Sequence, residues 1–230
     1  MPLPREVLVA SIEELLGRPL NDVEQKNAPK QLWIGTRRGV PLPGPRTAIV
    51  GTRKPSKRGI EAADEIASFL AKKKVVVVSG LAEGIDTAAH EATIREGGPT
   101  IAVIGTALDK SYPAKNSKLQ ETIMQKHWVV SQFQPGHPTQ RRNFVMRDWT
   151  MALIADASII VEAGETSGAM YEGWETLRLG RPLFLWTELL EDPSLKWPGE
   201  MLDYGAVSLL DLDDVMDSLP SSNRILEITF

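Results

Sequence analysis

The sequence predicts an α/β protein built on a doubly wound, mostly parallel sheet with helices on both faces. From residue 47 onward, short runs of Val, Ile and other apolar residues alternate with stretches of helical periodicity. These runs lack polar alternation, as is typical of strands that are buried on both faces of a sheet. Alternating strands and helices indicate a parallel sheet covered by helices. The predicted architecture is therefore Rossmann-like.

The wound core is predicted to contain six strands and five helices. In the first helix, Ile60, Ile66 and Leu70 recur on one face, which is the spacing of a helix packed on a sheet. The predicted strands cover residues 47–50, 75–78, 100–104, 128–131, 158–161 and 183–186. The predicted helices cover residues 57–72, 85–96, 114–126, 143–154 and 168–179. A later strand at 206–210 and a helix at 211–219 are predicted to extend one edge.

Residues 1–45 are predicted to form a short N-terminal extension and linker before a main domain at 46–230. Residues 7–16 have helical spacing, and residues 31–35 are predicted to form a short strand. The Pro-Leu-Pro-Gly-Pro segment at 41–45 cannot form a helix, because its prolines lack the amide donor and restrict the backbone.

Composition excludes several classes of protein. The 230 residues contain no cysteine, so a disulfide framework, a thiolate metal site and a cysteine nucleophile are all excluded. No apolar stretch approaches the ~20 residues that span a membrane, and the N-terminus lacks a signal-peptide pattern. We expect a cytoplasmic protein without membrane contact. The formal net charge of -4 indicates that any nucleic-acid site is a local patch rather than the whole surface.

Three of the predicted strands end in turns rich in glycine and hydroxyl residues. The turns are Gly-Thr-Arg-Lys-Pro-Ser at 51–56, Ser-Gly-Leu-Ala-Glu-Gly-Ile-Asp at 79–86 and Gly-Glu-Thr-Ser-Gly at 164–168. If these strands lie parallel in one sheet, their turns share one edge, where amide groups and helix N-termini attract anions. The sequence therefore predicts a phosphate-binding crevice at this edge. Arg53 could form a forked contact with a phosphate there, and Ser56 is placed to cap the next helix.

The ordered motifs closely resemble the DNA-processing protein A (DprA/Smf) family. The resemblance rests on the turns at 51–56 and 79–86, the latter continuing as Thr-Ala-Ala-His to residue 90. Further matches are Gly-Thr-Ala-Leu-Asp at 105–109, Tyr-Pro-Ala-Lys-Asn at 112–116, Val-Glu-Ala at 161–163 and Ser-Gly at 167–168. Together with Leu-Trp-Ile-Gly at 32–35, they extend over residues 29–186.

This resemblance implies a Rossmann-like domain that binds single-stranded DNA in a basic pocket. Members of the family protect incoming strands, load a RecA-type recombinase during natural transformation and act as dimers. Arg53 would contact phosphate, Lys115 and Lys118 would add positive charge, and Ser167 with Gly168 would form the far wall. The full set of phosphate-binding candidates is Gly51, Thr52, Arg53, Ser56, Ser79, Gly80, Gly84, Asp86, Lys115, Lys118, Arg142, Arg147, Ser167 and Gly168.

The sequence departs from the family pattern in two places. The family's Phe-Pro-x-Arg-Asn-Arg segment is Phe-Val-Met-Arg-Asp-Trp here, so Asp148 and Trp149 replace an amide and a cation. Asp148 makes the site less positive, although Arg141 and Arg142 could compensate, and Trp149 could stack on a base or pack in the core. Many family members also carry a winged-helix-like domain after the core, whereas residues 198–230 are too short and too acidic for one.

Other functions remain open at the level of sequence. Related phosphoribohydrolase-like enzymes cleave the N-glycosidic bond of nucleoside monophosphates, and Glu172 or Glu175 could serve as the carboxylate of such a reaction. A third possibility is a sensor that binds a free nucleotide without processing it. We expect no cofactor and no metal site, since His90, His127 and His137 show no ligand spacing.

Overall fold

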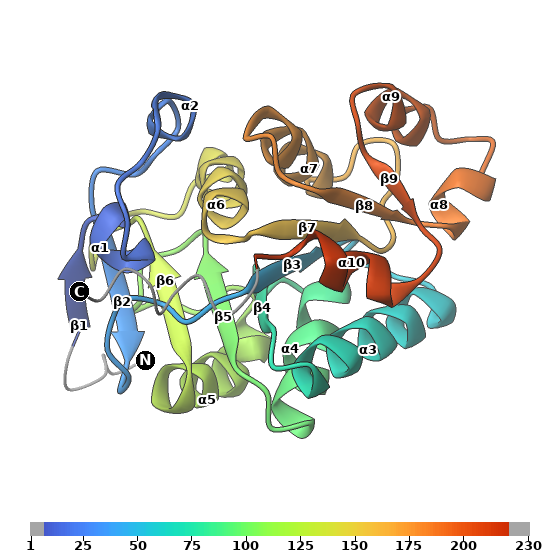
Figure 1. Cartoon of the computed structure of the whole chain (residues 1–230). Coiled ribbons are helices and arrows are strands. Elements are labelled where there is room, and N and C mark those ends of the chain that lie inside the picture. Colours follow the sequence, from blue (N-terminus) through green and yellow to red (C-terminus); the bar gives the residue numbers. More distant parts are fainter. Residues whose placement is uncertain (1–6, 221–230) are drawn as a thin grey trace.

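The computed structural model describes residues 7–220, and within them nine strands form one sheet in the order β1-β2-β6-β5-β4-β3-β7-β8-β9 (Figure 1). The strands are β1 (Val7–Ala10), β2 (Leu32–Thr36), β3 (Arg46–Val50), β4 (Val76–Ser79), β5 (Thr100–Ile104), β6 (Trp128–Ser131), β7 (Ala157–Ile160), β8 (Leu183–Trp186) and β9 (Val207–Leu209). The pairs from β6 through β9 are parallel, whereas β1 with β2 and β2 with β6 are antiparallel. The predicted mostly parallel α/β sheet is confirmed.

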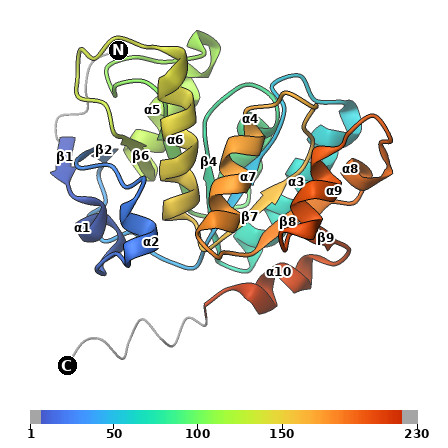
Figure 2. The same cartoon turned by 90° about the horizontal axis from the view of Figure 1, so that it is seen from above.

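Helices cover both faces of this sheet (Figure 2). They are α1 (Ile12–Leu16), α2 (Asp22–Gln25), α3 (Lys57–Lys72), α4 (Ile85–Arg95), α5 (Ser117–Lys126), α6 (Arg141–Ile154), α7 (Ala169–Arg178), α8 (Glu188–Glu191), α9 (Trp197–Asp203) and α10 (Leu212–Ser218). A short 3-10 helix, η1 (Ala114–Asn116), precedes α5, so the helix predicted for 114–126 begins with a tighter turn. The ends of the other core elements lie within a residue or two of their predicted positions.

The core has two sides, one on each face of the sheet, because successive side chains of a strand point to opposite faces. In β3, Ala48 and Val50 pack with α6, α7 and α9, whereas Ile49 packs with α3 and α4. The valines of β4 divide in the same way, since successive strand side chains point to opposite faces. On the second side, Ile66 and Leu70 of α3 are fully buried. Both faces of β3 and β4 are therefore covered, which explains their unbroken apolar runs.

The N-terminal segment differs from its predicted structure. The helix predicted over 7–16 is wrong, because residues 7–10 form the edge strand β1 and only Ile12–Leu16 is helical. Ser11 separates the two elements: its hydroxyl accepts from the Glu14 amide while the Glu14 side chain accepts from the Ser11 amide. The predicted strand at 31–35 is confirmed, shifted by one residue. Residues 1–6 of the predicted N-terminal extension and residues 221–230 of the predicted main domain lie outside the described residues.

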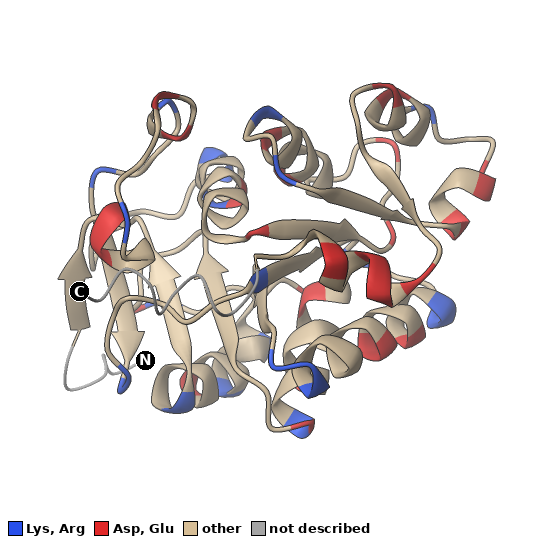
Figure 3. Cartoon of the chain, in the orientation of Figure 1, with Lys and Arg blue, Asp and Glu red and all other residues tan. Residues whose placement is uncertain are grey.

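Both β1 and β2 join the central sheet, so the N-terminal segment shares the core of the main domain. Its helix α2 also contacts the other half of the chain, because Arg181 pairs with the buried Glu24 at 2.7 Å. Acidic residues gather on α10 (Figure 3). Between residues 7 and 220, no helix has the length and apolar character needed to cross a membrane.

Candidate nucleic-acid interface

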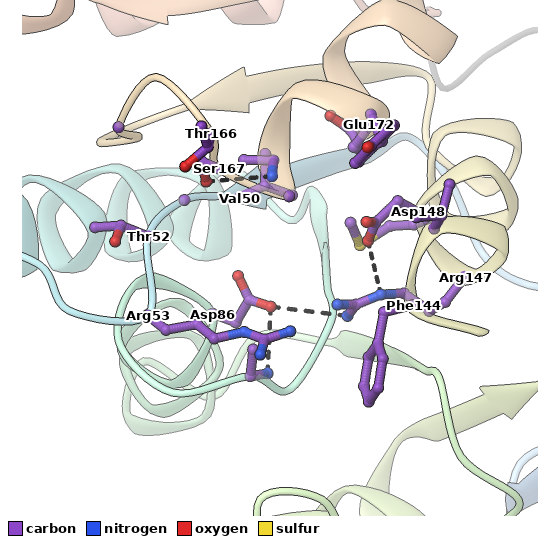
Figure 4. Close-up of a pocket in the computed structure, with 18 of the residues that line it drawn as sticks. Val50, Thr52, Arg53, Asp86, Phe144, Arg147, Asp148, Thr166, Ser167 and Glu172 are labelled. Carbon is purple, nitrogen blue, oxygen red and sulfur yellow. Dashed lines mark hydrogen bonds and ion pairs between the residues drawn. The ribbon is translucent and has the colours of Figure 1, made fainter. Parts of the chain in front are cut away.

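A cavity of about 500 Å³ lies at the C-terminal ends of the central strands, between the turns that follow β3, β4 and β7 (Figure 4). Its walls are completed by α6 and α7. The strands adjoining β3 on its two sides are β4 and β7. The chain runs from β3 outward through β4, β5 and β6 and then crosses back to β7, so the strand order reverses at β3. In open α/β sheets, ligands bind at such a reversal of strand order.

All three glycine- and hydroxyl-rich turns reach this cavity. The first provides Gly51, Thr52 and Arg53, and the second provides Asp86. The remaining predicted residues that line the cavity come from the third turn and from the two helices. Ser167 and Gly168 belong to the turn, Arg147 to α6 and Glu172 to α7. Residues from distant parts of the chain are therefore brought together at one edge of the sheet.

Arg53 lies at the exposed rim of the cavity. Its guanidinium carbon lies 5.4 Å from the ring centroid of Phe144 on α6, which is a cation–π contact. The next residue, Lys54, is also exposed and lines the cavity. Phe144 was absent from the sequence-based site, although it opens the Phe-Val-Met-Arg-Asp-Trp segment. The rim therefore combines two cations with one aromatic face.

Arg147, by contrast, is buried in the cavity wall, with 5% of its surface exposed. Its guanidinium donates to the Val103 carbonyl at 3.2 Å and lies 2.7 Å from Asp148 and 3.8 Å from Asp86. Gly80 leaves the space for it, because a Cβ at that position would overlap the Arg147 guanidinium. Two acidic side chains therefore hold Arg147 within the protein.

Three buried carboxyl groups face the cavity, and burial changes their protonation. Desolvation raises the pKa of Asp148 to about 7, against the opposing charge of Arg147. Burial likewise raises the pKa of Glu172 to about 7, although hydrogen bonds from Ser158 and Thr176 oppose the rise. The pKa of Asp86 is also raised by burial, with Arg147 acting against it. Asp148 and Glu172 therefore titrate near neutral pH, and the pKa of Asp86 is shifted in the same direction.

The three helix N-termini at this edge have hydrogen-bond partners within the protein. The carboxylate of Glu162 accepts hydrogen bonds from the Ser56 amide and hydroxyl at the start of α3, the latter at 2.8 Å. At the start of α4, the Ile85 amide donates to the Thr52 carbonyl at 3.3 Å. At α7, the Ala169 amide donates to the Ser167 hydroxyl at 3.4 Å, and both the exposed Gly168 and the first helical residue, Ala169, line the cavity. The partial positive charge of α7 therefore faces the cavity.

Four residues predicted for the site stabilise its turns and do not line the cavity. The Ser56 hydroxyl accepts from the Gly59 amide as the N-cap of α3. The buried Ser79 hydroxyl donates to the Ile49 carbonyl at 2.7 Å. Gly84 has a φ of 80°, and a Cβ there would meet the Thr52 carbonyl oxygen. Gly80, as described above, makes room for Arg147.

Three predicted cations lie outside the cavity lining. Lys115 is exposed and pairs with Glu83 at 3.0 Å, while the adjacent Asn116 amide group donates to the Ala82 carbonyl at the cavity wall. Lys118 is exposed on α5, beside a separate shallow hollow. Arg142 is exposed in the first turn of α6.

Glu175, Trp149 and His90 are also placed away from the cavity. Glu175 faces α2, where it accepts from Asn27 at 3.0 Å and from Arg178. Trp149 is half-buried on α6 and is absent from the lining. His90 is fully buried, lies 2.8 Å from the Thr100 hydroxyl and has its pKa lowered to about 3 by desolvation. Of the two glutamates considered for catalysis, only Glu172 reaches the cavity.

Comparison with known proteins identifies the family. The chain is 31% identical over 180 residues to the DNA processing protein DprA of Bacillus subtilis, covering 78% of this chain and 61% of that protein. It is 40% identical over 140 residues to DprA of Streptococcus pneumoniae, covering 61% of this chain and 49% of that protein. The chain therefore spans about half to three-fifths of the length of these relatives.

Solved structures agree with the sequence comparison. The crystal structure of Streptococcus pneumoniae DprA matches with a TM-score of 0.78 and 30% identity, over 94% of this chain and 76% of that one. DNA processing protein A of Helicobacter pylori, described in its single-stranded DNA binding mode, shares the fold with a TM-score of 0.73 and 24% identity, over 98% of this chain and 99% of that one. The model of the DNA recombination-mediator protein A family matches residues 18–220. The resemblance drawn from the motifs is confirmed: the chain belongs to the DNA recombination-mediator protein A (DprA/Smf) family.

Proposed function

We propose that this protein binds single-stranded DNA at the cavity, with the phosphates of the strand against its rim. The observation that carries the proposal is the exposed pair Arg53 and Lys54 at the rim of a cavity that the N-terminus of α7 also lines, with Arg53 over the Phe144 ring. A cationic rim and an aromatic face are the two features by which proteins bind single strands, through phosphate contacts and base stacking. The Helicobacter pylori relative, described in its single-stranded DNA binding mode, supports this assignment.

The strand would extend from the cavity over nearby exposed cations. Arg142 lies five residues before Arg147 on α6, and Lys115 lies beside the turn that follows β4. Lys118 continues from Lys115 along α5. The positive charge is therefore local, which reconciles a DNA site with a net charge of -4.

The biological setting follows from the family and is part of the same proposal. We propose that the protein acts in the cytoplasm on incoming or recombining strands, as a homodimer and with a RecA-type recombinase as its partner. Membership in the DNA recombination-mediator protein A family supports these partners.

A nucleotide-binding or nucleotide-processing role is the second candidate. Glu172 favours it, because this buried carboxyl lines the cavity and its pKa is raised to about 7, the range of a general acid or base. The exposed Arg53 would hold the phosphate of a mononucleotide. Release of free base from a nucleoside monophosphate incubated with the protein would establish this activity.

The test is a fluorescence-anisotropy titration with a labelled dT oligonucleotide at several salt concentrations, with AMP as a competitor. Each phosphate neutralised on a single strand contributes about 0.7 to the slope of log Kd against log salt. Two rim cations therefore predict a slope of about 1.4 or more. AMP should compete weakly, because it offers one phosphate to a rim that binds several. Affinity independent of salt, or full displacement by equimolar AMP, would contradict the proposal.

A further inference from the structure

Positive and negative side chains occupy different parts of the cavity. The cations Arg53 and Lys54 are exposed at the rim. The acids Asp86, Asp148 and Glu172 are buried in the wall, at 4%, 6% and 0% exposure. An ionised carboxylate repels a phosphate, and this repulsion is stronger across a protein interior than through water. A strand bound at the rim therefore lies close to acidic groups whose charge opposes its binding.

The three acids cannot all be ionised without cost, because the cavity wall contains one buried base, Arg147. Its Nε lies 2.7 Å from Asp148 and its Nη1 lies 3.8 Å from Asp86, so two acids share one guanidinium (Figure 4). An unbalanced buried charge is unfavourable, and a buried carboxyl avoids it by holding a proton. The geometry of the wall therefore favours a proton on a carboxyl group beside the rim.

Asp148 is the acid of the wall that is coupled to the rim. It follows Phe144 by four residues on α6, so the two side chains lie on the same face of the helix. The Arg53 guanidinium lies over the Phe144 ring, and its charge acts on the Asp148 carboxyl. Glu172, by contrast, comes from α7, and its Oε1 accepts hydrogen bonds from two hydroxyl groups of the core.

We infer that binding of a strand at the rim is coupled to uptake of a proton by Asp148, so that the affinity for single-stranded DNA rises as the pH falls. This inference rests on the proposed function and concerns the regulation of the same site. A bound phosphate disfavours the ionised form of Asp148, as a like charge does. By linkage, protonation of Asp148 favours the bound phosphate to the same extent.

The effect falls in the physiological range of pH. Burial raises the pKa of Asp148 to about 7, although Arg147 opposes the rise. A phosphate at the rim should raise this pKa further, by about one unit. Asp148 then binds its proton more tightly in the complex than in the free protein. The contribution of the proton to DNA affinity is therefore complete below about pH 7 and is lost above about pH 8.

Other groups at the cavity also carry charge or can titrate, and the experiment must separate their effects from that of Asp148. They come from four elements: Arg147 on α6, Asp86 on α4, Glu172 and Tyr171 on α7, and Arg53 and Lys54 after β3. Glu172 is the main competitor, because burial raises its pKa to about 7 as well. Substitutions at Asp148 and at Glu172 are therefore compared.

The experiment measures the Kd of a labelled dT 12-mer by fluorescence anisotropy at pH 6 and pH 8.5, at constant ionic strength. Neither thymine nor the phosphates change charge in this range. With a shift of one unit in the pKa of Asp148, the wild-type protein should bind about sevenfold more tightly at pH 6. Asp148→Asn should bind with nearly the same Kd at both pH values, and more tightly than the wild type at pH 8.5. Asp203→Asn, which changes an exposed acid on α9 outside the cavity, is the matched control and should keep the full pH dependence.

Isothermal titration calorimetry measures the proton directly and needs no variant. Titrations of dT 12-mer at pH 7.5, in two buffers with different enthalpies of ionisation, give the number of protons taken up on binding. The wild-type protein should take up about half a proton for each bound strand, because part of Asp148 is already protonated at this pH. Asp148→Asn should take up almost none. Thermal unfolding checks that each variant is folded at both pH values.

The outcomes separate this inference from the proposed function. Equal Kd values at pH 6 and pH 8.5, with no uptake of protons, would overturn the inference and leave DNA binding intact. Loss of the pH dependence in Glu172→Gln but not in Asp148→Asn would assign the proton to Glu172 and would also overturn it. A failure of the oligonucleotide to bind at either pH would overturn the proposed function and the inference with it.

Discussion

Arg53 and Arg147 lie at the same cavity but are held in opposite ways. Arg147 is buried and held by Asp148 and Asp86, so it stabilises the wall and is little exposed to a ligand. Arg53 is exposed, rests on the Phe144 ring and keeps its charge at the rim. The electrostatic attraction for DNA should therefore depend on Arg53 more than on Arg147.

Arg53→Ala should weaken binding of a dT oligonucleotide by about 1.5 kcal/mol, roughly tenfold in Kd, because a charge-assisted contact with phosphate is lost. The slope of log Kd against log salt should also fall by about 0.7, the contribution of one phosphate on a single strand. Anisotropy titrations at two salt concentrations measure both effects.

Arg37→Ala is the control for this substitution. Arg37 is exposed and follows β2, whose last residue, Thr36, pairs with Trp128 at the start of β6. It therefore lies at the edge of the sheet opposite the cavity. Unchanged affinity in Arg53→Ala, or an equal loss in Arg37→Ala, would remove Arg53 from the site.

The turn between β4 and α4 shows how one element positions another. Gly80 lies against the guanidinium of Arg147, and Gly84 adopts a φ of 80° that favours glycine. Asp86, in the first turn of α4, accepts from the Ala82 amide at 3.2 Å and faces Arg147. The glycines of this turn therefore serve packing and backbone geometry.

Gly80→Ala should destabilise the fold by about 3 kcal/mol. The added methyl group displaces Arg147 and separates a buried guanidinium from its carboxylate partners. Urea unfolding measures the change. Gly199→Ala is the matched control, because Gly199 lies within α9 and a Cβ there would meet no atom within 4 Å. If the two variants unfold at the same urea concentration, the role assigned to Gly80 is wrong.

At the scale of the whole molecule, the buried carboxyl groups couple folding to pH. Glu172 has an ordinary pKa of 4.5, and burial raises its pKa in the folded chain to about 7. Between these values the folded chain holds a proton that the unfolded chain has released. Protonated Glu172 therefore makes its full contribution to the free energy of unfolding below pH 4.5, and this contribution is lost as the pH rises to about 7.

Glu172→Gln should make the free energy of unfolding less dependent on pH, because it removes a decrease of about 3 kcal/mol between pH 4.5 and pH 7. Urea unfolding of both proteins at pH 5, 6, 7 and 8 measures it. The buried His90 and His127, whose pKa values are lowered to about 3 and 4, act in the opposite direction but are present in both proteins. Their effect cancels in the comparison. Parallel stability curves for the two proteins would show that Glu172 is ionised throughout this range.

Much of the fold could be predicted, because its signals are local. The unbroken Val and Ile runs identify the buried strands, and the spacing of Ile66 and Leu70 identifies the covered face of α3. The error at residues 7–16 has a physical cause as well. A short edge strand followed by a capped helix has an apolar pattern that also fits one helix, and the pairing of β1 with β2 decides between them.

The sequence by itself determined the family, the parallel sheet and the three turns at one edge, because ordered motifs and hydrophobic periodicity are properties of neighbouring residues. The tertiary structure alone decided how those residues are used: Arg53 is exposed while Arg147 is buried between acidic side chains, and Glu172 lines the cavity while Glu175 pairs with Arg178. Charge, burial and pKa depend on neighbours that are distant along the chain. Those neighbours meet only when β3, β4 and β7 lie side by side beneath α6 and α7.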